Sequence, residues 1–316
     1  MDKRALILFL LVGLTFSGSA PSQFIQVLGK EDFDLRGPVK SAEVLTSYGK
    51  ETYEFNEQGL LTKSVTEFNE TDYEVVYYKY GVKGNLQEKR SESYRNGTFD
   101  PATSIAHFYE VQEGSGQDSA ATKKITERVI SYDRSFQEQY VYAYGADGNL
   151  NGFVRLNDEG KDEMSLEHKR ENGETTVTHL WNDVPTKLVR TSKKKTKTGA
   201  VRHVKLTKKY IEGVPEEAVE EVTGEDGLIL ERQLFHWDPE KKSFVPTVKT
   251  TFEYDEGDRL VLEVSKKGKV TTEKKFMYQF DGSVPQNWIK KIETPENSYV
   301  TRKISYYAPA PTEDQK

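Results

Sequence analysis

Apolar and polar residues alternate with a period of two along most of the chain. In the stretch 248–254, Val, Thr, Phe and Tyr fall on one side of an extended segment, and Lys, Thr and Glu fall on the other. The same alternation is present at 260–264, 275–280 and 300–306, whereas helical periodicity is scarce. Alternation of this kind is typical of antiparallel strands with one buried face. The pattern therefore predicts an all-β protein.

A short motif recurs at the ends of these stretches. Two aromatic residues separated by one residue are followed by Asn, Asp or Gly, then by a turn that contains Gly, and then by Leu. Rings spaced in this way share one face of a strand, and Asn, Asp and Gly tolerate the left-handed backbone of a tight turn. Each copy predicts a hairpin corner, and the series predicts an antiparallel meander of β-hairpin repeats forming a curled or elongated sheet. The copies lie at 53–60, 78–86, 142–150 and 252–260, with a degraded copy at 278–289.

This motif resembles the YD or RHS-like repeats of secreted bacterial proteins, in which Tyr-x-Tyr-Asp precedes a Gly-Asn turn and a Leu. The opening Leu-Arg-Gly-Pro-Val-Lys-Ser at 35–41, followed by the copy at 53–60, is similar to the short, non-toxin members in particular. Long members wind many hairpins into a hollow shell and sometimes carry a toxin, whereas this sequence has about five copies at uneven spacing, and we recognise no toxin-like region after them. The resemblance implies a hairpin sheet and no particular activity, because the short members have none assigned.

The N-terminus predicts export. Lys3 and Arg4 precede an apolar stretch at 5–16 and small residues at 17–20, which is the order of a secretory signal peptide and too short for a membrane-spanning helix. We expect residues 1–20 to form a signal peptide cleaved near Ala20, residues 21–308 to form the repeat-built β domain, and residues 309–316 to form a disordered tail. The motif fades after residue 162, so a domain boundary near 157–171 stays an alternative. The expected location of the mature protein is periplasmic or extracellular.

Composition narrows the function classes. The formal charge is −6, and proteins that neutralise phosphates usually have a basic excess, so we expect no nucleic acid partner. The chain has no cysteine, which excludes disulfides, thiol nucleophiles and a lipid-modified cysteine. The mean hydropathy of −0.74 and the charges that alternate with apolar residues argue against an outer-membrane barrel, whose lipid-facing residues are uncharged. We therefore expect the mature protein not to span a membrane.

Few residues form a pattern that is typical of a catalytic, metal-binding or cofactor-binding site. The histidines show no pair at the spacing of common metal sites, and the chain has no nucleophile elbow, phosphate-binding loop or Cys-His arrangement. We therefore expect no catalytic residues, no metal and no cofactor. Paired carboxylates of a glycan-cleaving hydrolase are not visible in a sequence, so this activity stays an alternative. The histidines are His107, His168, His179, His203 and His236.

Two sets of residues are candidates for ligand binding. The tryptophans are large rings that suit a platform for sugars, and a lysine cluster suits an anionic polymer such as an acidic glycan or lipopolysaccharide. The alternatives are that the tryptophans belong to the core and that the lysines, beside Gly199, mark a solvated hairpin tip. The candidates are Trp181, Trp237 and Trp288, and Lys193, Lys194, Lys195 and Lys197.

Export, repetition and the missing catalytic motifs favour a non-catalytic binding or surface-interaction protein, with a glycan or a cell-envelope protein as its partner. A structural scaffold of a cell-surface assembly and a glycan-cleaving hydrolase are the alternatives. The sequence makes no prediction of oligomeric state.

Overall fold

The computed structural model describes residues 25–113, 123–135 and 137–308. The expected signal peptide at 1–20 and the expected tail at 309–316 lie outside the described residues. Within them the chain forms one short 3₁₀ helix, η1 (Lys30–Phe33), and 20 strands, and no helix is long and apolar enough to cross a bilayer. The strands are β1 (Val39–Thr46), β2 (Gly49–Phe55), β3 (Leu61–Glu67), β4 (Tyr73–Tyr80), β5 (Leu86–Arg95), β6 (Thr98–Glu113), β7 (Lys123–Ser131), β8 (Gln137–Tyr144), β9 (Leu150–Asn157), β10 (Gly160–Glu171), β11 (Glu174–Trp181), β12 (Val184–Lys195), β13 (Val201–Ile211), β14 (Val214–Thr223), β15 (Ile229–Asp238), β16 (Ser243–Tyr254), β17 (Leu260–Lys267), β18 (Val270–Phe280), β19 (Trp288–Thr294) and β20 (Ser298–Tyr306).

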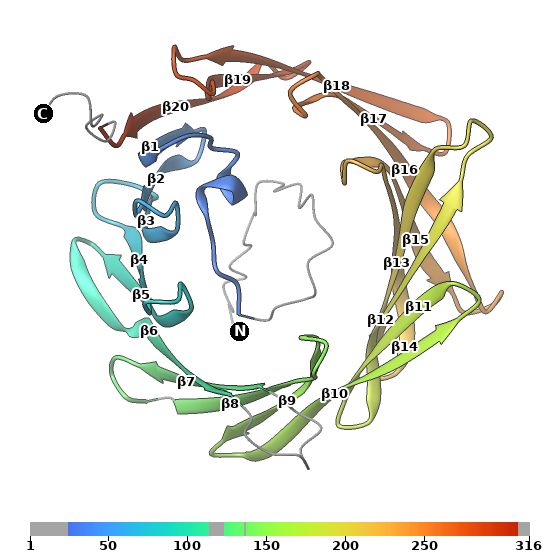
Figure 1. Cartoon of the computed structure of the whole chain (residues 1–316), viewed down its shortest axis with the longest axis horizontal. Helices are drawn as coiled ribbons and strands as arrows, with labels where there is room; N and C mark the ends of the chain where they lie inside the picture. The colour runs from blue at the N-terminus through green and yellow to red at the C-terminus, as the bar shows by residue number, and fades with distance from the viewer. Residues whose placement is uncertain (1–24, 114–122, 136, 309–316) are drawn as a thin grey trace, which may run out of the picture.

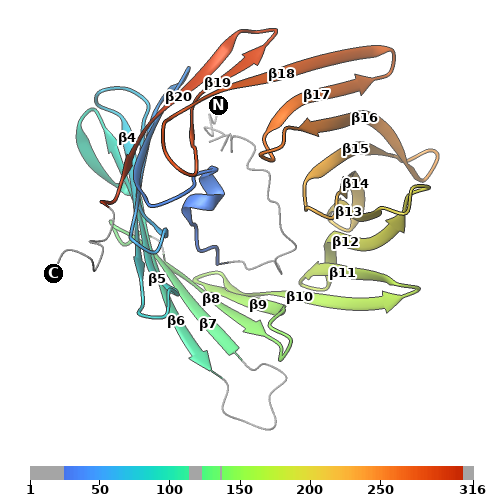
Figure 2. The ribbon, with the colours of Figure 1, turned by 45° about the horizontal axis from the view of Figure 1, so that its top comes forward.

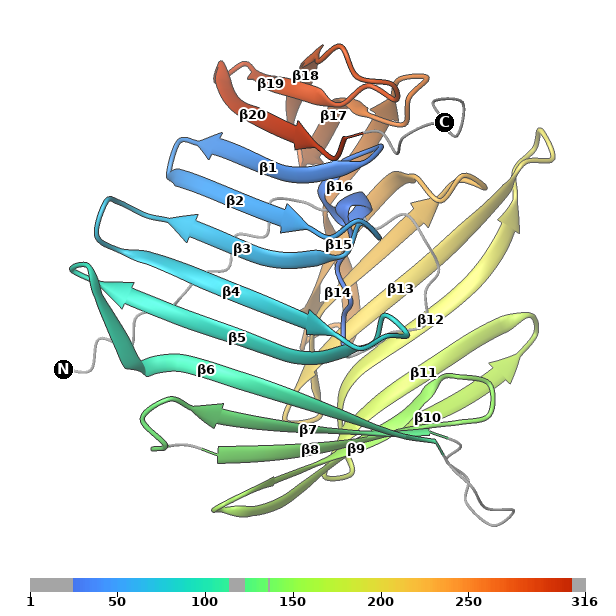
Figure 3. The ribbon, with the colours of Figure 1, turned by 60° about the vertical axis from the view of Figure 1, so that its left-hand side comes forward.

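The strands form one closed antiparallel sheet. Each strand pairs with the strands before and after it, and β1 pairs with β20, where Ala42 lies opposite Ile304. Figure 1 shows the resulting ring, and Figure 3 shows β1 to β6 side by side in its wall. The prediction of an all-β antiparallel hairpin meander is therefore confirmed, and the sheet closes into a 20-stranded β-barrel. Closure leaves no unpaired strand edge for aggregation.

The predicted hairpin corners are present, and they share one hydrogen-bonding pattern. In six corners of the described chain the first residue donates its N–H to the carbonyl of the fifth, and the fourth donates to the carbonyl of the first. The fourth residue has a positive φ, +81° at Gly59 and +75° at Gly148, so each corner is a type I turn closed by a left-handed residue. In the corner after β16 the left-handed residue is Asp258 and not Gly257. The six corners lie at 56–60, 81–85, 145–149, 196–200, 224–228 and 255–259.

Two of these corners lack the aromatic pair and escaped the sequence pattern. The corner at 196–200 follows Lys193 and Lys195, and the corner at 224–228 follows Glu221 and Thr223, where other corners have two rings. All six corners therefore share the same backbone hydrogen bonds, whereas the aromatic side chains before them are present in only four. The hairpin repeat also continues through the stretch 157–171, because β9 and β10 pair directly with Arg155 opposite Asp162.

Tight turns form most connections at the opposite rim of the barrel. At 96–97, 182–183 and 212–213 both turn residues have a positive φ, which is the geometry of the two-residue type I′ turn. This turn matches the right-handed twist of the strands that it joins. The six corners therefore lie at one rim and these three turns at the other, although the turn at 172–173, which joins β10 to β11 at the rim of the corners, also has two residues with a positive φ.

The N-terminal segment identifies the inner face of the wall. The described part of this segment, including η1, lies inside the ring (Figures 1 and 2). The ring of Phe33 lies 4.3 Å from that of Tyr53 and 5.6 Å from that of Phe55, and Ile25 packs on a cluster that includes Tyr142. Because cross-strand partners share a face, the register carries this assignment around the barrel. The aromatic pairs of the corners point inward.

Three side chains from β19, β20 and the residue before β19 hold the N-terminal segment against the wall. Arg302 donates to the backbone carbonyls of Phe33 (2.9 Å) and Asp34 (3.2 Å), and its guanidinium carbon lies 3.4 Å from the ring centre of Trp288. Trp288 Nε1 donates to Asp34 Oδ2 at 2.6 Å, and the buried Asn287 accepts from the N–H of Arg36 at 2.7 Å. We call this contact, formed by Arg302, Trp288 and Asn287, the N-terminal clamp.

The wall is one layer thick and both of its faces are wet. Strands 4.8 Å apart and tilted by about 40° close a 20-stranded ring at a backbone diameter of roughly 40 Å, too wide for side chains from opposite walls to meet. Residues on the inner face therefore line a lumen.

The outer face carries charge on most strands. On β1, Glu43 lies between the inward Ala42 and Val44, and the ion pair of Lys63 with Glu54 (3.4 Å) joins β3 to β2 on this face. On β12 and β13 the outer face pairs apolar with charged residues, because Leu188 lies opposite Lys208 and Leu206 opposite Arg190. Further charged residues at the middle of strands on the outer face are Arg90, Arg128, Glu167, Lys249, Lys275 and Lys303.

Candidate functional site: the inner wall of the barrel

An arc of aromatic side chains lines one part of the lumen. The ring of Phe153 lies 5.7 Å from Tyr140, 5.4 Å from Tyr142 and 5.8 Å from Trp181. Tyr142 is buried, whereas Tyr140, Phe153 and Trp181 are half-buried. These rings come from β8, β9 and β11, whose inward positions face the lumen. We call Tyr140, Tyr142, Phe153 and Trp181 the aromatic arc.

A buried carboxylate anchors the wall next to the arc. Glu127 on β7 accepts from Tyr142 Oη at 2.6 Å, and its Oε1 lies 2.7 Å from His107 Nδ1. Although burial alone raises it, hydrogen bonds from His107, Tyr142 and Tyr109 hold the pKa of Glu127 below its ordinary value. Burial followed by the charge of Glu127 raises the pKa of Tyr142. The carboxylate is therefore ionised and the phenols neutral at pH 7, which suits a structural hydrogen-bond network better than proton transfer.

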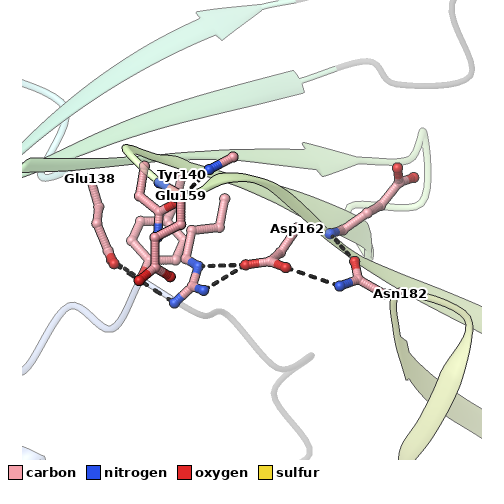
Figure 4. A network of polar contacts seen from close by, with 9 residues as sticks. Glu138, Tyr140, Glu159, Asp162 and Asn182 are labelled. Carbon is pink, nitrogen blue, oxygen red and sulfur yellow. Dashed lines mark hydrogen bonds and ion pairs between the residues drawn. The ribbon is translucent and has the colours of Figure 1, made fainter.

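A second polar network ties Arg155 to the wall between β8 and β10. Arg155 donates Nε and Nη2 to Asp162 Oδ2 at 3.0 and 2.5 Å, and its Nη1 lies 3.7 Å from Glu138. Asn182 donates to the other oxygen of Asp162 at 2.9 Å, as Figure 4 shows. The guanidinium also lies 5.4 Å from the ring centre of Trp181. Hydrogen bonds from Asn182 and then from Arg155 lower the pKa of Asp162, whereas the general acid of a glycosidase needs a raised pKa.

The inner face of β12 and β13 is basic. Lys187 lies directly opposite Lys209, Thr191 opposite Lys205, and Lys193 opposite His203. We call Lys187, Lys193, Lys195, Lys205 and Lys209 the basic face. All five are exposed. On these two strands the inner face carries no carboxylate.

Desolvation and neighbouring positive charges lower the pKa of two groups on this wall, Lys187 of the basic face and the adjacent His179. Desolvation by the surrounding wall, followed by the charges of Lys205 and Lys209, lowers the pKa of Lys187, even though part of its side chain is exposed. Burial, followed by the charges of Lys187 and His168, lowers the pKa of His179 to about 4. His179 lies opposite Lys187 on the neighbouring strand and is 8% exposed. The lumen here has a positive potential at pH 7.

The structure places the three candidate tryptophans in different surroundings. Trp181 belongs to the aromatic arc, on the same inner wall as the basic face. Trp237 lies on the outer face opposite Phe244, with a ring distance of 5.1 Å. Trp288 is 7% exposed and its indole N–H is used by the N-terminal clamp. For a ligand inside the barrel, Trp181 is the one of the three with a half-buried ring on the lumen side.

The structure also places the candidate lysines in different surroundings. Lys193 and Lys195 point inward, Lys194 points outward opposite Arg202, and Lys197 lies in the corner at 196–200. The cluster is thus at a hairpin tip beside Gly199, as one of the two interpretations expected. Sequence reasoning missed the inward direction of Lys193 and Lys195, although a signal was available. They occupy the two positions before a corner where other repeats have the inward aromatic pair.

One pocket of the described residues is part of the fold and not of the aromatic arc or the basic face. A pocket beside Arg302 is lined by Asp281, Ser283 and Tyr306, whose side chains hydrogen-bond one another next to the N-terminal clamp. Within the described ranges, no group of three or more His, Cys, Asp or Glu side chains is arranged to hold a metal ion.

Comparison with known proteins gives no family. No protein-family model matches the chain, and no curated protein matches it either. Among solved structures, the chain is similar to a porin-like protein from Bacteroides uniformis, with 9% sequence identity over 86% of this chain and 99% of that chain, at a TM-score of 0.31. A likeness at this level carries no inference about function.

Proposed function

We propose that the protein is an exported, non-catalytic binding protein that holds a glycan chain along the inner wall of its barrel. The observation that carries this proposal is the aromatic arc, in which the half-buried rings of Tyr140, Phe153 and Trp181 line a lumen too wide to be closed by side chains. Aromatic faces are the usual platforms for sugar rings, and a concave wall gives them a common orientation. Arg155 and the Glu127 network hold the arc rigid, which lowers the entropic cost of binding.

We also propose that the barrel works in an aqueous compartment of the cell envelope or outside the cell. The support is the outer wall, where charged residues such as Glu43, Arg128 and Lys303 stand at the middle of their strands. A single Arg or Lys at the bilayer midplane costs about 2–4 kcal/mol, and this wall would expose several. Fractionation of cells that express the full chain tests this point. Recovery without detergent is expected, and carbonate-resistant membrane insertion would contradict it.

Substitution of Trp181 tests glycan binding, with Trp237 as the matched control. Trp181→Ala removes the lumenal ring, whereas Trp237→Ala removes a ring of equal size from the outer face. Loss of one stacked ring should weaken glycan affinity roughly tenfold, about 1.4 kcal/mol, in titrations on a panel of soluble oligosaccharides. Equal affinity of the wild type and Trp181→Ala for every bound glycan, or loss only in Trp237→Ala, would exclude the proposed site.

A further inference from the structure

The basic face has little counter-charge within the described residues. Among the cations of β9 to β15 that point inward, Arg155 is paired with Asp162, Lys209 with Glu217 at 2.5 Å, and Arg232 with Glu221 at 2.9 Å. The other four members of the basic face form no ion pair in the part of the chain that the structure describes, although Lys205 lies opposite Glu221, whose carboxylate pairs with Arg232. They are Lys187, Lys193, Lys195 and Lys205.

This arrangement is unfavourable for the empty wall. Like charges directly across a strand pair destabilise a sheet, and Lys187 faces Lys209 in this way. The chain as a whole carries a net charge of −6. The positive charge of this wall is therefore opposite in sign to the net charge of the protein. A concave wall that carries one sign of charge concentrates ions of the other sign. An anionic ligand would supply the missing counter-charge.

The positions of the lysines indicate an extended ligand. Lys187, Lys193 and Lys195 alternate along one strand, and eight residues of strand span roughly 26 Å. One end of this row lies near Trp181, because Trp181 and His179 face the first residues of β12. A single small anion would contact one or two of these lysines, whereas a chain that lies along the strand would contact all of them.

We infer that the ligand of the inner wall is a polyanionic chain, and that the basic face selects it over neutral chains of the same length. This inference rests on the proposed function, because it names the chemical class of ligand that the lumen takes. The aromatic arc supplies contacts that any sugar ring can use, and the lysines supply the discrimination. An acidic glycan such as a polyuronate combines both features.

Two charge-matched variants test the inference. The inner variant replaces Lys187, Lys193, Lys195 and Lys205 with Gln. The outer variant replaces Lys124, Lys194, Lys266 and Lys303 with Gln. All eight lysines are exposed, none has an ion pair among the described residues, and both variants change the net charge by the same amount.

The assay measures affinity for an oligogalacturonate, a neutral glucan oligomer of equal length and inorganic polyphosphate, each at low and high salt. We expect the inner variant to lose at least tenfold in affinity for oligogalacturonate and most of its salt dependence, and the outer variant to stay within about twofold of the wild type. Equal losses in both variants, or equal wild-type affinity for the neutral and the acidic glycan, would overturn the inference while leaving a glycan-binding lumen intact. Binding of polyphosphate without any glycan would support polyanion selection by the basic face and overturn the proposed glycan function.

Discussion

The N-terminal clamp gives the sharpest prediction about stability, because Arg302 combines favourable contacts with an expensive burial. Its two hydrogen bonds to the carbonyls of Phe33 and Asp34 are charge-assisted and contribute about 1.5–3 kcal/mol each. Its stack on Trp288, desolvated on that side, adds about 2 kcal/mol. Against this, burial lowers the pKa of Arg302 from 12.5 to about 10, a cost to the charged form of about 3 kcal/mol. Its buried Nε has no hydrogen-bond partner in the described structure, which is part of that cost.

The favourable contacts exceed the cost, so Arg302→Leu should lower the free energy of unfolding by about 2–5 kcal/mol. Urea denaturation followed by tryptophan fluorescence measures the loss, and amide hydrogen exchange of residues 28–36 should rise, because the clamp holds this segment to the wall. Arg128→Leu is the control. Arg128 is exposed on the outer face, so its loss should change stability by less than about 0.5 kcal/mol.

An Arg302→Leu protein as stable as the wild type, with unchanged exchange in residues 28–36, would refute this reasoning. It would mean that desolvation of the guanidinium outweighs its hydrogen bonds, as occurs when some buried ion pairs are replaced by apolar residues.

Three further predictions follow from other parts of the wall. Gly152→Ala should destabilise the barrel by about 3 kcal/mol or more, because its Cβ would lie 2.3 Å from a backbone oxygen of the neighbouring strand, whereas Gly282→Ala, with nothing within 4 Å, should be neutral in the same denaturation assay. His179, whose pKa is lowered to about 4 by burial and nearby positive charge, should stabilise the barrel above pH 6.5 and lose up to about 3 kcal/mol of that stability as the pH falls to 4. His179→Gln should flatten this slope in unfolding measurements between pH 4 and 7, and an unchanged slope would show that another group causes it. Tyr142→Phe removes a buried hydrogen-bond donor to Glu127, so it should lower the free energy of unfolding by about 1–3 kcal/mol and raise the pKa of that carboxylate. NMR titration of Glu127 would detect the change in pKa, and an unchanged pKa would contradict the proposed hydrogen-bond network.

The face of the wall on which a side chain stands explains most of the chemistry of the site. In strands β7 and β8 the inward positions carry Glu127, Tyr140 and Tyr142, and the outward positions carry Arg128 and Gln139. A shift of one residue in register would exchange these two sets. The basic face and the aromatic arc are therefore consequences of register as much as of composition.

The sequence by itself determined the local structure. The period-two alternation and the left-handed turn residues act over a few neighbouring residues, so the strands and corners at 56–60, 81–85, 145–149 and 255–259 were predictable. The corners at 196–200 and 224–228 were not, because Gly199 and Gly227 supply the backbone geometry without the aromatic pair. The turn itself does not require the aromatic pair, whose rings instead line the lumen.

Only the tertiary structure decided how the strands close and which side faces in. Closure depends on the pairing of Ala42 with Ile304, which are far apart in the chain, and no local pattern encodes that contact. Before closure, two alternating faces are equivalent, so the sequence could not show that Lys193 points into the lumen with Trp181 while Trp237 points out. It could not place Trp288 in the clamp either, because its partner Asp34 reaches it only from the segment inside the ring. Local forces therefore set the strands and turns, whereas long-range pairing and the enclosed N-terminal segment set the inner wall.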